Sequence, residues 1–136
     1  MGSLDGLVAG FGCRPGCPPA ELHALLQRAL GLANAATADL VGIATLTQRL
    51  HAPALTALAA SLGLPLAGYG AAALLPFEPW LSHRSEISWR HVGCHGVAES
   101  AALAHCSALS ASPARLAVTR LCSAAATVAL AARAST

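Results

Sequence analysis

The hydrophobic positions of this chain form short continuous runs separated by stretches with helical spacing. Residues Leu7–Cys13 and Leu40–Leu46 are apolar runs, and Leu64–Gly68 is a shorter one. None of them alternates polar with apolar side chains, which is typical of strands that are covered on both faces. Because helical stretches separate the runs, the pattern predicts an α/β fold with a mainly parallel sheet.

Three stretches are predicted to be helical. The first follows Cys17 and is expected to end at Gly31, the second begins at Pro53 and ends before Gly63, and the third covers residues 97–109. The third helix has small inward residues, mostly alanine, which allow a helix to lie close to a sheet. In the first helix the apolar residues recur at i, i+3, i+4, i+7 and i+8, at Leu22, Leu25, Leu26, Ala29 and Leu30.

The end of the chain predicts a β-hairpin. Its strands are expected at Leu116–Leu121 and Thr127–Ala131, although the connection lacks the Asn-Gly or Asp-Gly of a tight hairpin turn. Residues Tyr69–Val92 predict a short helical turn and a long loop. At 136 residues the chain is expected to be one domain, residues 1–136.

Composition excludes two classes of protein. The net charge is +2, all eight basic residues are arginine, and only 4% of residues are aromatic, which does not suit a nucleic-acid surface. The longest stretch without charged residues, Leu50–Phe77, is interrupted by proline and glycine, so it does not predict a membrane-spanning helix. Five cysteines and the lack of a basic leader before Asp5 predict reduced thiols and a cytoplasmic location.

The loop after the first strand is the first candidate for function. Residues Arg14-Pro15-Gly16 are expected to turn the chain into the first helix, and the region where a strand, a glycine-bearing turn and a helix N-terminus meet is where open α/β sheets bind ligands. Glycines at 10, 12 and 16 match neither the dinucleotide fingerprint nor the P-loop. Taken alone, Gly10 and Gly12 are better explained as glycines that let the next helix pack closely on the strand.

Several phrases taken together resemble the cobalamin-biosynthesis family formed by CobE and the C-terminal domain of CbiG. The likeness extends from about Leu7 to Ala132, and its phrases keep the same order at similar intervals. The chain departs from the family at the start of the first helix and in the last hairpin, where it has Ser123-Ala124 instead of glycine or asparagine. The phrases are Val8–Gly16, Glu21–Leu22, Leu40–Thr45, Leu58–Leu66 and Gly96–Leu103.

The resemblance implies a three-layer α/β/α fold and a cytoplasmic role in building the corrin ring. CbiG-like proteins open a lactone on a cobalt-precorrin and release acetaldehyde, but that activity belongs to chains with an additional N-terminal domain. This chain is therefore expected to be the CobE-like form, which binds a precorrin-type intermediate and has other cobalamin-pathway enzymes as partners. Its oligomeric state stays open.

The resemblance also directs attention to groups that bind carboxylates, because precorrins carry many of them around an apolar macrocycle. Arg14 and the glycine amides near helix N-termini are the expected anion donors. Phe11, Trp80 and Trp89 are the expected apolar groups, although ordinary partial burial explains each tryptophan as well. The predicted substrate-binding residues are Gly12, Cys13, Arg14, Gly16, Thr45, Gly93, Gly96, Glu99 and Arg120.

Two other functions stay open on sequence alone. One is catalysis on the macrocycle through Glu99, His95 or Cys13, and the other is a subunit that binds a pathway enzyme through its alanine-rich faces. No cofactor is expected. The C-x-x-x-C spacing of Cys13 and Cys17 and the adjacent Cys-His pairs do not fit a structural zinc site, so no metal is expected either.

Overall fold

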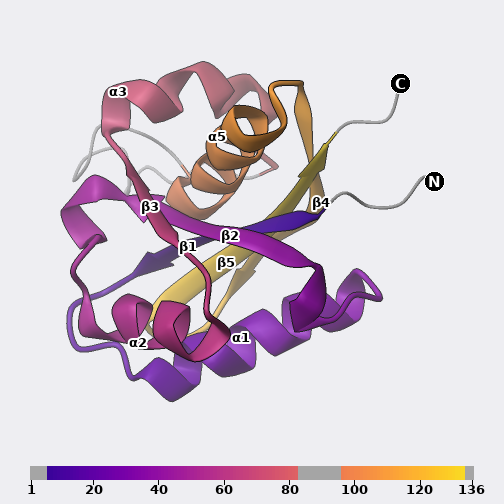
Figure 1. The fold of residues 1–136 in the computed structure, drawn as a ribbon. Coiled ribbons are helices and arrows are strands. Elements are labelled where there is room, and N and C mark those ends of the chain that lie inside the picture. Colours follow the sequence, from indigo (N-terminus) through magenta and orange to yellow (C-terminus); the bar gives the residue numbers. More distant parts are fainter. Residues whose placement is uncertain (1–5, 83–95, 134–136) are drawn as a thin grey trace.

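A computed structural model of the chain describes residues 6–82 and 96–133. The described residues contain a five-stranded sheet with the strand order β3-β2-β1-β5-β4, so that β1 is central (Figure 1). No helix among these residues has the length and apolar character needed to cross a membrane. The strands are β1 (Leu7–Cys13), β2 (Leu40–Leu46), β3 (Leu66–Tyr69), β4 (Ala114–Cys122) and β5 (Ala126–Arg133).

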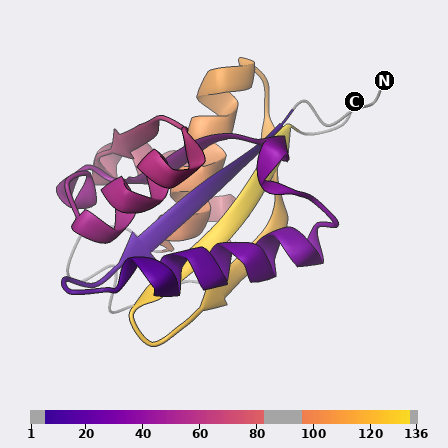
Figure 2. The ribbon, with the colours of Figure 1, turned by 60° about the horizontal axis from the view of Figure 1, so that its bottom comes forward.

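Helices cover both faces of the sheet. Helices α1 (Pro19–Leu32) and α2 (Pro53–Leu62) lie on one face, while α3 (Ala71–Leu74) and α5 (Val97–Ser110) lie on the other (Figures 1 and 2). The fold is therefore mixed α/β. Short 3₁₀ helices follow several elements and are named η1 (Thr37–Asp39), η2 (Thr47–Arg49) and η3 (Leu75–Trp80).

The sheet is mixed, and the prediction of a mainly parallel sheet is corrected. Strands β1, β2 and β3 pair in parallel, but β5 pairs antiparallel with both β1 and β4. The expected C-terminal hairpin forms, and it inserts β5 beside the central strand. Continuous apolar runs indicate burial on both faces and carry no information on strand direction, so the sequence pattern could not distinguish these arrangements.

The element boundaries follow the sequence pattern within a few residues. Helix α1 ends at Leu32 instead of Gly31, and the third strand begins two residues later than expected, at Leu66. The long segment after β3 contains α3 and η3 in its described part, in place of one helical turn, and the rest of it lies outside the described residues.

Successive residues of β1 contact different helices. Leu7, Ala9 and Phe11 belong to the large apolar cluster shared with α1 and α2, while Val8 packs with residues of α5. At Gly10 the α5 backbone comes so close that an added Cβ would lie 2.0 Å from the carbonyl oxygen of Ala98. Gly10 is therefore required by the close approach of α5 to the sheet.

A tertiary contact stabilises the turn between β4 and β5, which has no glycine or asparagine. Glu21 Oε2, from the first turn of α1, accepts a hydrogen bond from Ala125 N–H at 2.6 Å and another from the Ser123 hydroxyl. The Ser123 N–H also donates to the Ala126 carbonyl at 2.8 Å. The hydrogen bonds from Ser123 and Ala125 lower the pKa of Glu21 below its ordinary value.

The close approach at Gly10 leads to a first prediction. Gly10→Ala should lower the free energy of unfolding by about 3 kcal/mol or more, because the methyl group must displace helix backbone. Gly31→Ala is the control: it lies inside α1 with no described residue within 4 Å of the added Cβ, and it should stabilise by about 0.5 to 1 kcal/mol. Urea unfolding measures both, and equal stabilities would refute the proposed packing.

The Glu21 contact leads to a second prediction. Glu21→Gln should lower the urea midpoint at neutral pH, because charge-assisted hydrogen bonds to the turn are lost. The folded-state pKa is lowered, so this stabilisation is present above the ordinary value of 4.5 and disappears as pH falls through the folded pKa. The difference between wild type and variant should therefore shrink in acid. Asp39→Asn controls for net charge, because the exposed Asp39 carboxylate accepts a hydrogen bond from Ala36 N–H within its own turn and joins no distant segments; a difference that is constant with pH would contradict the role of Glu21.

Candidate functional site

The first turn of α5 lies over the carboxyl end of β1. A Cβ added at Gly12 would be 4.0 Å from the Cβ of Val97, and the backbone of Ala98 lies against Gly10. Gly96, the N-cap residue of α5, has a positive φ of 51°, and no side chain of the described residues caps the helix. This helix N-terminus therefore brings a partial positive charge to the edge of the sheet where β1 ends.

Several chain segments end or begin at this same edge. Gly12 pairs with Thr127 of β5, Leu121 of β4 pairs with Val128, and Val128 pairs with Phe11. We call the carboxyl ends of β1, β2 and β4, the start of β5 and the first turn of α5 the carboxyl edge. It is the position at which open α/β sheets commonly bind ligands.

The predicted turn after β1 is confirmed and is fixed at both ends. Cys17 N–H donates to the Arg14 carbonyl at 3.1 Å, with Pro15 and Gly16 between them and a φ of 83° at Gly16. Arg14 N–H donates to the Ala125 carbonyl at 2.9 Å, which joins this loop to the β4–β5 turn. The Arg14 side chain is exposed, so its guanidinium is accessible from solvent at the carboxyl edge.

Thr45 and Glu99 are fully buried, and their polar atoms are bonded within the protein. The Thr45 hydroxyl donates to the Phe11 carbonyl at 2.8 Å and so links β2 to β1. The Glu99 carboxylate accepts hydrogen bonds from the backbone N–H groups of Ser82 and Arg120, each at 2.8 Å, and from the Ser82 hydroxyl. Glu99 therefore joins α5 to β4 and to the residues after η3.

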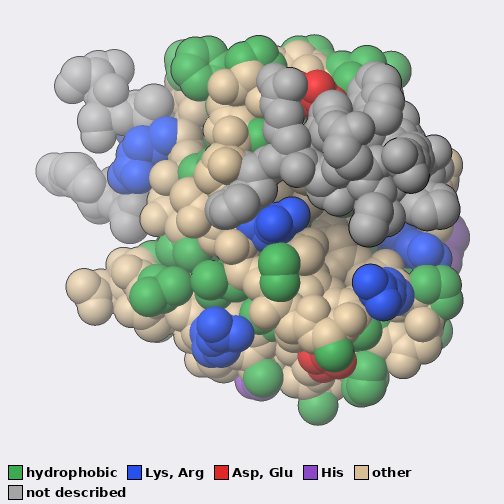
Figure 3. All heavy atoms as spheres, turned by 180° about the vertical axis from the view of Figure 1, so that it is seen from behind, with side chains coloured by type: hydrophobic (Ala, Val, Ile, Leu, Met, Phe, Trp, Pro, Cys, Tyr) green, Lys and Arg blue, Asp and Glu red, His purple; other side chains and the backbone are tan. Residues whose placement is uncertain are grey.

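Two further arginines approach the carboxyl edge. Arg49, at the end of η2, lies near enough to Cys13 for its charge to act on the thiol: burial raises the pKa of Cys13, and Arg49 partly offsets the rise. Arg120, in β4, has a buried Nε without a hydrogen-bond partner within the described part of the chain. On the face seen in Figure 3 the arginine side chains are scattered and form no continuous patch.

The pKa values of Cys13 and Cys17 are raised, which favours the protonated thiols at neutral pH. Burial raises the pKa of Cys17, and the nearby Glu21 and Cys13 raise it further. Protonated thiols are weak nucleophiles and poor metal ligands. Within residues 6–82 and 96–133, no group of three or more histidine, cysteine, aspartate or glutamate side chains is arranged to hold a metal ion.

Most of the predicted site residues converge on the carboxyl edge. Gly16 lies in the loop that leaves this edge, whereas Gly93, Cys94, His95 and Trp89 lie outside the described residues. Phe11 is fully buried in the core, so its expected role as an apolar ligand contact is wrong. The residues that the structure brings to the carboxyl edge are Gly12, Cys13, Arg14, Thr45, Gly96, Glu99 and Arg120.

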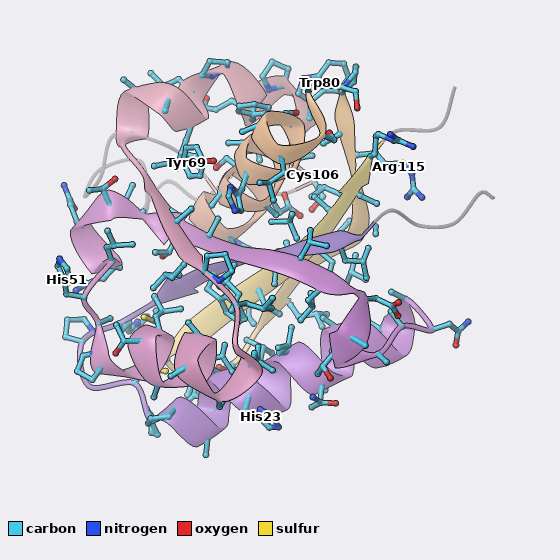
Figure 4. The ribbon with its side chains drawn as sticks, viewed as in Figure 1. His23, His51, Tyr69, Trp80, Cys106 and Arg115 are labelled. Atoms are coloured by element: carbon cyan, nitrogen blue, oxygen red, sulfur yellow. The ribbon has the colours of Figure 1, made fainter. Side chains whose placement is uncertain are left out.

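Trp80 was expected as an apolar ligand contact, whereas Arg49 was not expected at the site. Trp80, at the end of η3, is 69% exposed and lies at the outside of the molecule (Figure 4). Sequence reasoning missed Arg49, because it follows a strand in a segment without any recognisable motif. The one available signal was its position three residues after the second apolar run.

Known proteins of one family match the chain in both sequence and structure. The family described as "Cobalamin synthesis G C-terminus" matches residues 7–131. A protein named CobE from Sinorhizobium sp. is 45% identical over 98 residues, which are 72% of this chain and 64% of that relative. This chain therefore matches somewhat less than two thirds of the relative's length.

Solved structures agree with this result. The crystal structure of CobE, a protein from the cobalamin (vitamin B12) biosynthetic pathway, has a TM-score of 0.92 at 36% identity and covers 100% of this chain and 94% of its own. Cobalamin biosynthesis protein chiG from Agrobacterium tumefaciens has a TM-score of 0.70 at 26% identity, with 95% of this chain and 99% of that chain covered. The chain belongs to the CobE and CbiG C-terminal family of cobalamin biosynthesis.

Proposed function

We propose that this chain takes part in cobalamin biosynthesis by binding a precorrin-type tetrapyrrole at the carboxyl edge. The observation that carries the proposal is the convergence of Arg14, Arg49 and the uncapped N-terminus of α5 on one edge of the sheet. A ligand with several carboxylates needs cationic donors from more than one direction, and these come from three separate segments.

Energetics require an apolar contribution as well. An anion at an exposed helix N-terminus gains about 0.3 to 1 kcal/mol, whereas micromolar affinity needs about 8 kcal/mol. Burying about 250 Å² of macrocycle would add about 6 kcal/mol at about 25 cal/mol per Å². Trp80 is the largest exposed apolar side chain of the described residues, but Figure 4 shows it on the side of the molecule where Arg115 lies, so it is not assigned to this contact.

The buried polar residues of the edge have a positioning role in this proposal. Thr45 holds the ends of β1 and β2 together, and Glu99 holds α5, β4 and Ser82 together. Because these contacts occupy the Glu99 carboxylate, the arrangement favours ligand binding over acid–base catalysis by Glu99. Pathway enzymes that supply or receive the tetrapyrrole are the expected partners.

A titration tests the proposal with charge-matched variants. Adding a purified precorrin to the wild-type chain should shift the absorbance spectrum of the pigment, and Arg14→Ala and Arg49→Ala should each weaken binding about tenfold by removing a charge-assisted contact. Arg28→Ala is the control, because Arg28 is an exposed arginine farther along α1. Increasing salt should weaken wild-type binding more than binding to either variant.

Several outcomes would count against this site. If all three variants bind equally, the pigment lies elsewhere, and if the wild type neither shifts the spectrum nor retains the pigment, the chain does not bind it. Mass analysis of the recovered pigment separates binding from turnover: an unchanged mass agrees with the proposal, and a changed mass replaces it with a catalytic role.

A further inference from the structure

A tyrosine and a histidine join the edge strand β3 to helix α5. Tyr69 is the last residue of β3, and its hydroxyl lies 2.8 Å from Nδ1 of His105 on α5. The two ring centroids are 5.7 Å apart, at an interplanar angle of 58°. Figure 4 shows Tyr69 projecting from β3 toward α5. This contact connects the last strand at one side of the sheet to the helix that covers its centre.

His105 has little access to water, and its second ring nitrogen has no partner among residues 6–82 and 96–133. The side chain is 8% exposed, and Nε2 is buried without a hydrogen bond within the described part of the chain. Nε2 faces the backbone of Gly42 on β2, where an added Cβ would lie 2.8 Å away. Burial lowers the pKa of His105 below its ordinary value of 6.5, and no charged group of the described residues contributes to this shift.

Every described element packed against the ring disfavours its charged form. From β3 the titratable group is Tyr69, and burial raises its pKa, so it remains a neutral phenol. From β2 the neighbour is the glycine backbone, and Leu109 of α5 adds apolar surface near Gly42. An imidazolium at this position could still donate through Nδ1 to the Tyr69 oxygen, but its Nε2–H would be buried without an acceptor.

The β3 side of this contact is the weaker one. Strand β3 has four residues, all of them partly buried, and it pairs with β2 alone. Helix α5, in contrast, contributes a series of fully buried residues and lies directly on β1 at Gly10. Local opening therefore requires less free energy at β3 than at α5.

We propose that Tyr69 and His105 form an acid-sensitive latch, so that mild acid releases edge strand β3 while the rest of the sheet stays folded. The latch is strongest above the ordinary histidine pKa of 6.5, where open and closed states both hold a neutral ring. As pH falls from there toward the lower pKa of the closed state, the open state binds a proton and the closed state does not. Opening becomes about tenfold more favourable for each pH unit in this range.

Hydrogen exchange measured by mass spectrometry at about pH 7.5 and about pH 5.5, and corrected for intrinsic rates, tests the latch. Protection of residues 66–69 should be lower than that of β1 at both pH values and should fall by up to about tenfold in mild acid, the limit that an open-state pKa of 6.5 sets. His105→Gln can still bond to Tyr69 but does not titrate, so it should remove the pH dependence in β3. His23→Gln, at an exposed histidine of α1, is the control and should behave as wild type.

Two results would overturn the latch. One is protection of β3 that equals that of β1 at both pH values, which would mean that β3 opens only when the whole sheet unfolds, and the other is an unchanged pH dependence of β3 in His105→Gln. If His105→Gln does not fold, Tyr69→Phe takes its place: β3 should then be less protected at neutral pH and should keep its sensitivity to acid. An NMR titration that gives His105 an ordinary pKa would contradict the latch in the same way.

Discussion

The close packing of α5 on the central strand is the contact on which the rest of the molecule depends. Gly10 has no Cβ, and the facing turn of α5 has alanine at Ala98 and Ala102, so the backbone of the helix lies directly against β1. This contact fixes where α5 begins. Its N-terminus comes to lie over the end of β1, next to the loop that contains Arg14, and a bulkier residue at Gly10 would displace it.

Much of the fold is predictable because hydrophobic periodicity records burial. The apolar runs located the strands, and the spacing from Leu22 to Leu30 located the buried face of α1. Hydrophobic periodicity does not record strand direction, so it could not correct the expectation of a mainly parallel sheet. Glu21 illustrates a second limit: its place in the first turn of a helix indicates only an interaction with the dipole of that helix, but it binds the β4–β5 turn about 100 residues later in the chain.

Site residues that belong to a local sequence motif could be predicted, whereas a site residue that only tertiary contacts bring to the carboxyl edge was missed. The turn Arg14-Pro15-Gly16 could be recognised from its residue types, and it forms as expected. Arg49 has no motif around it, and only the pairing of β1 with β2 brings it near Cys13. Phe11 failed as a ligand contact because alternation along β1 directs it into the core.

The central claim is that a carboxylate-rich tetrapyrrole binds at the carboxyl edge, and NMR mapping of backbone amides tests it most directly. On addition of a purified precorrin, the account predicts the largest shifts at Gly12, Arg14, Arg49 and Gly96. Arg115 and Arg133 lie at the opposite end of the sheet, where β4 begins and β5 ends, and should not shift. Shifts confined to that opposite end, or no shifts at all, would contradict the account.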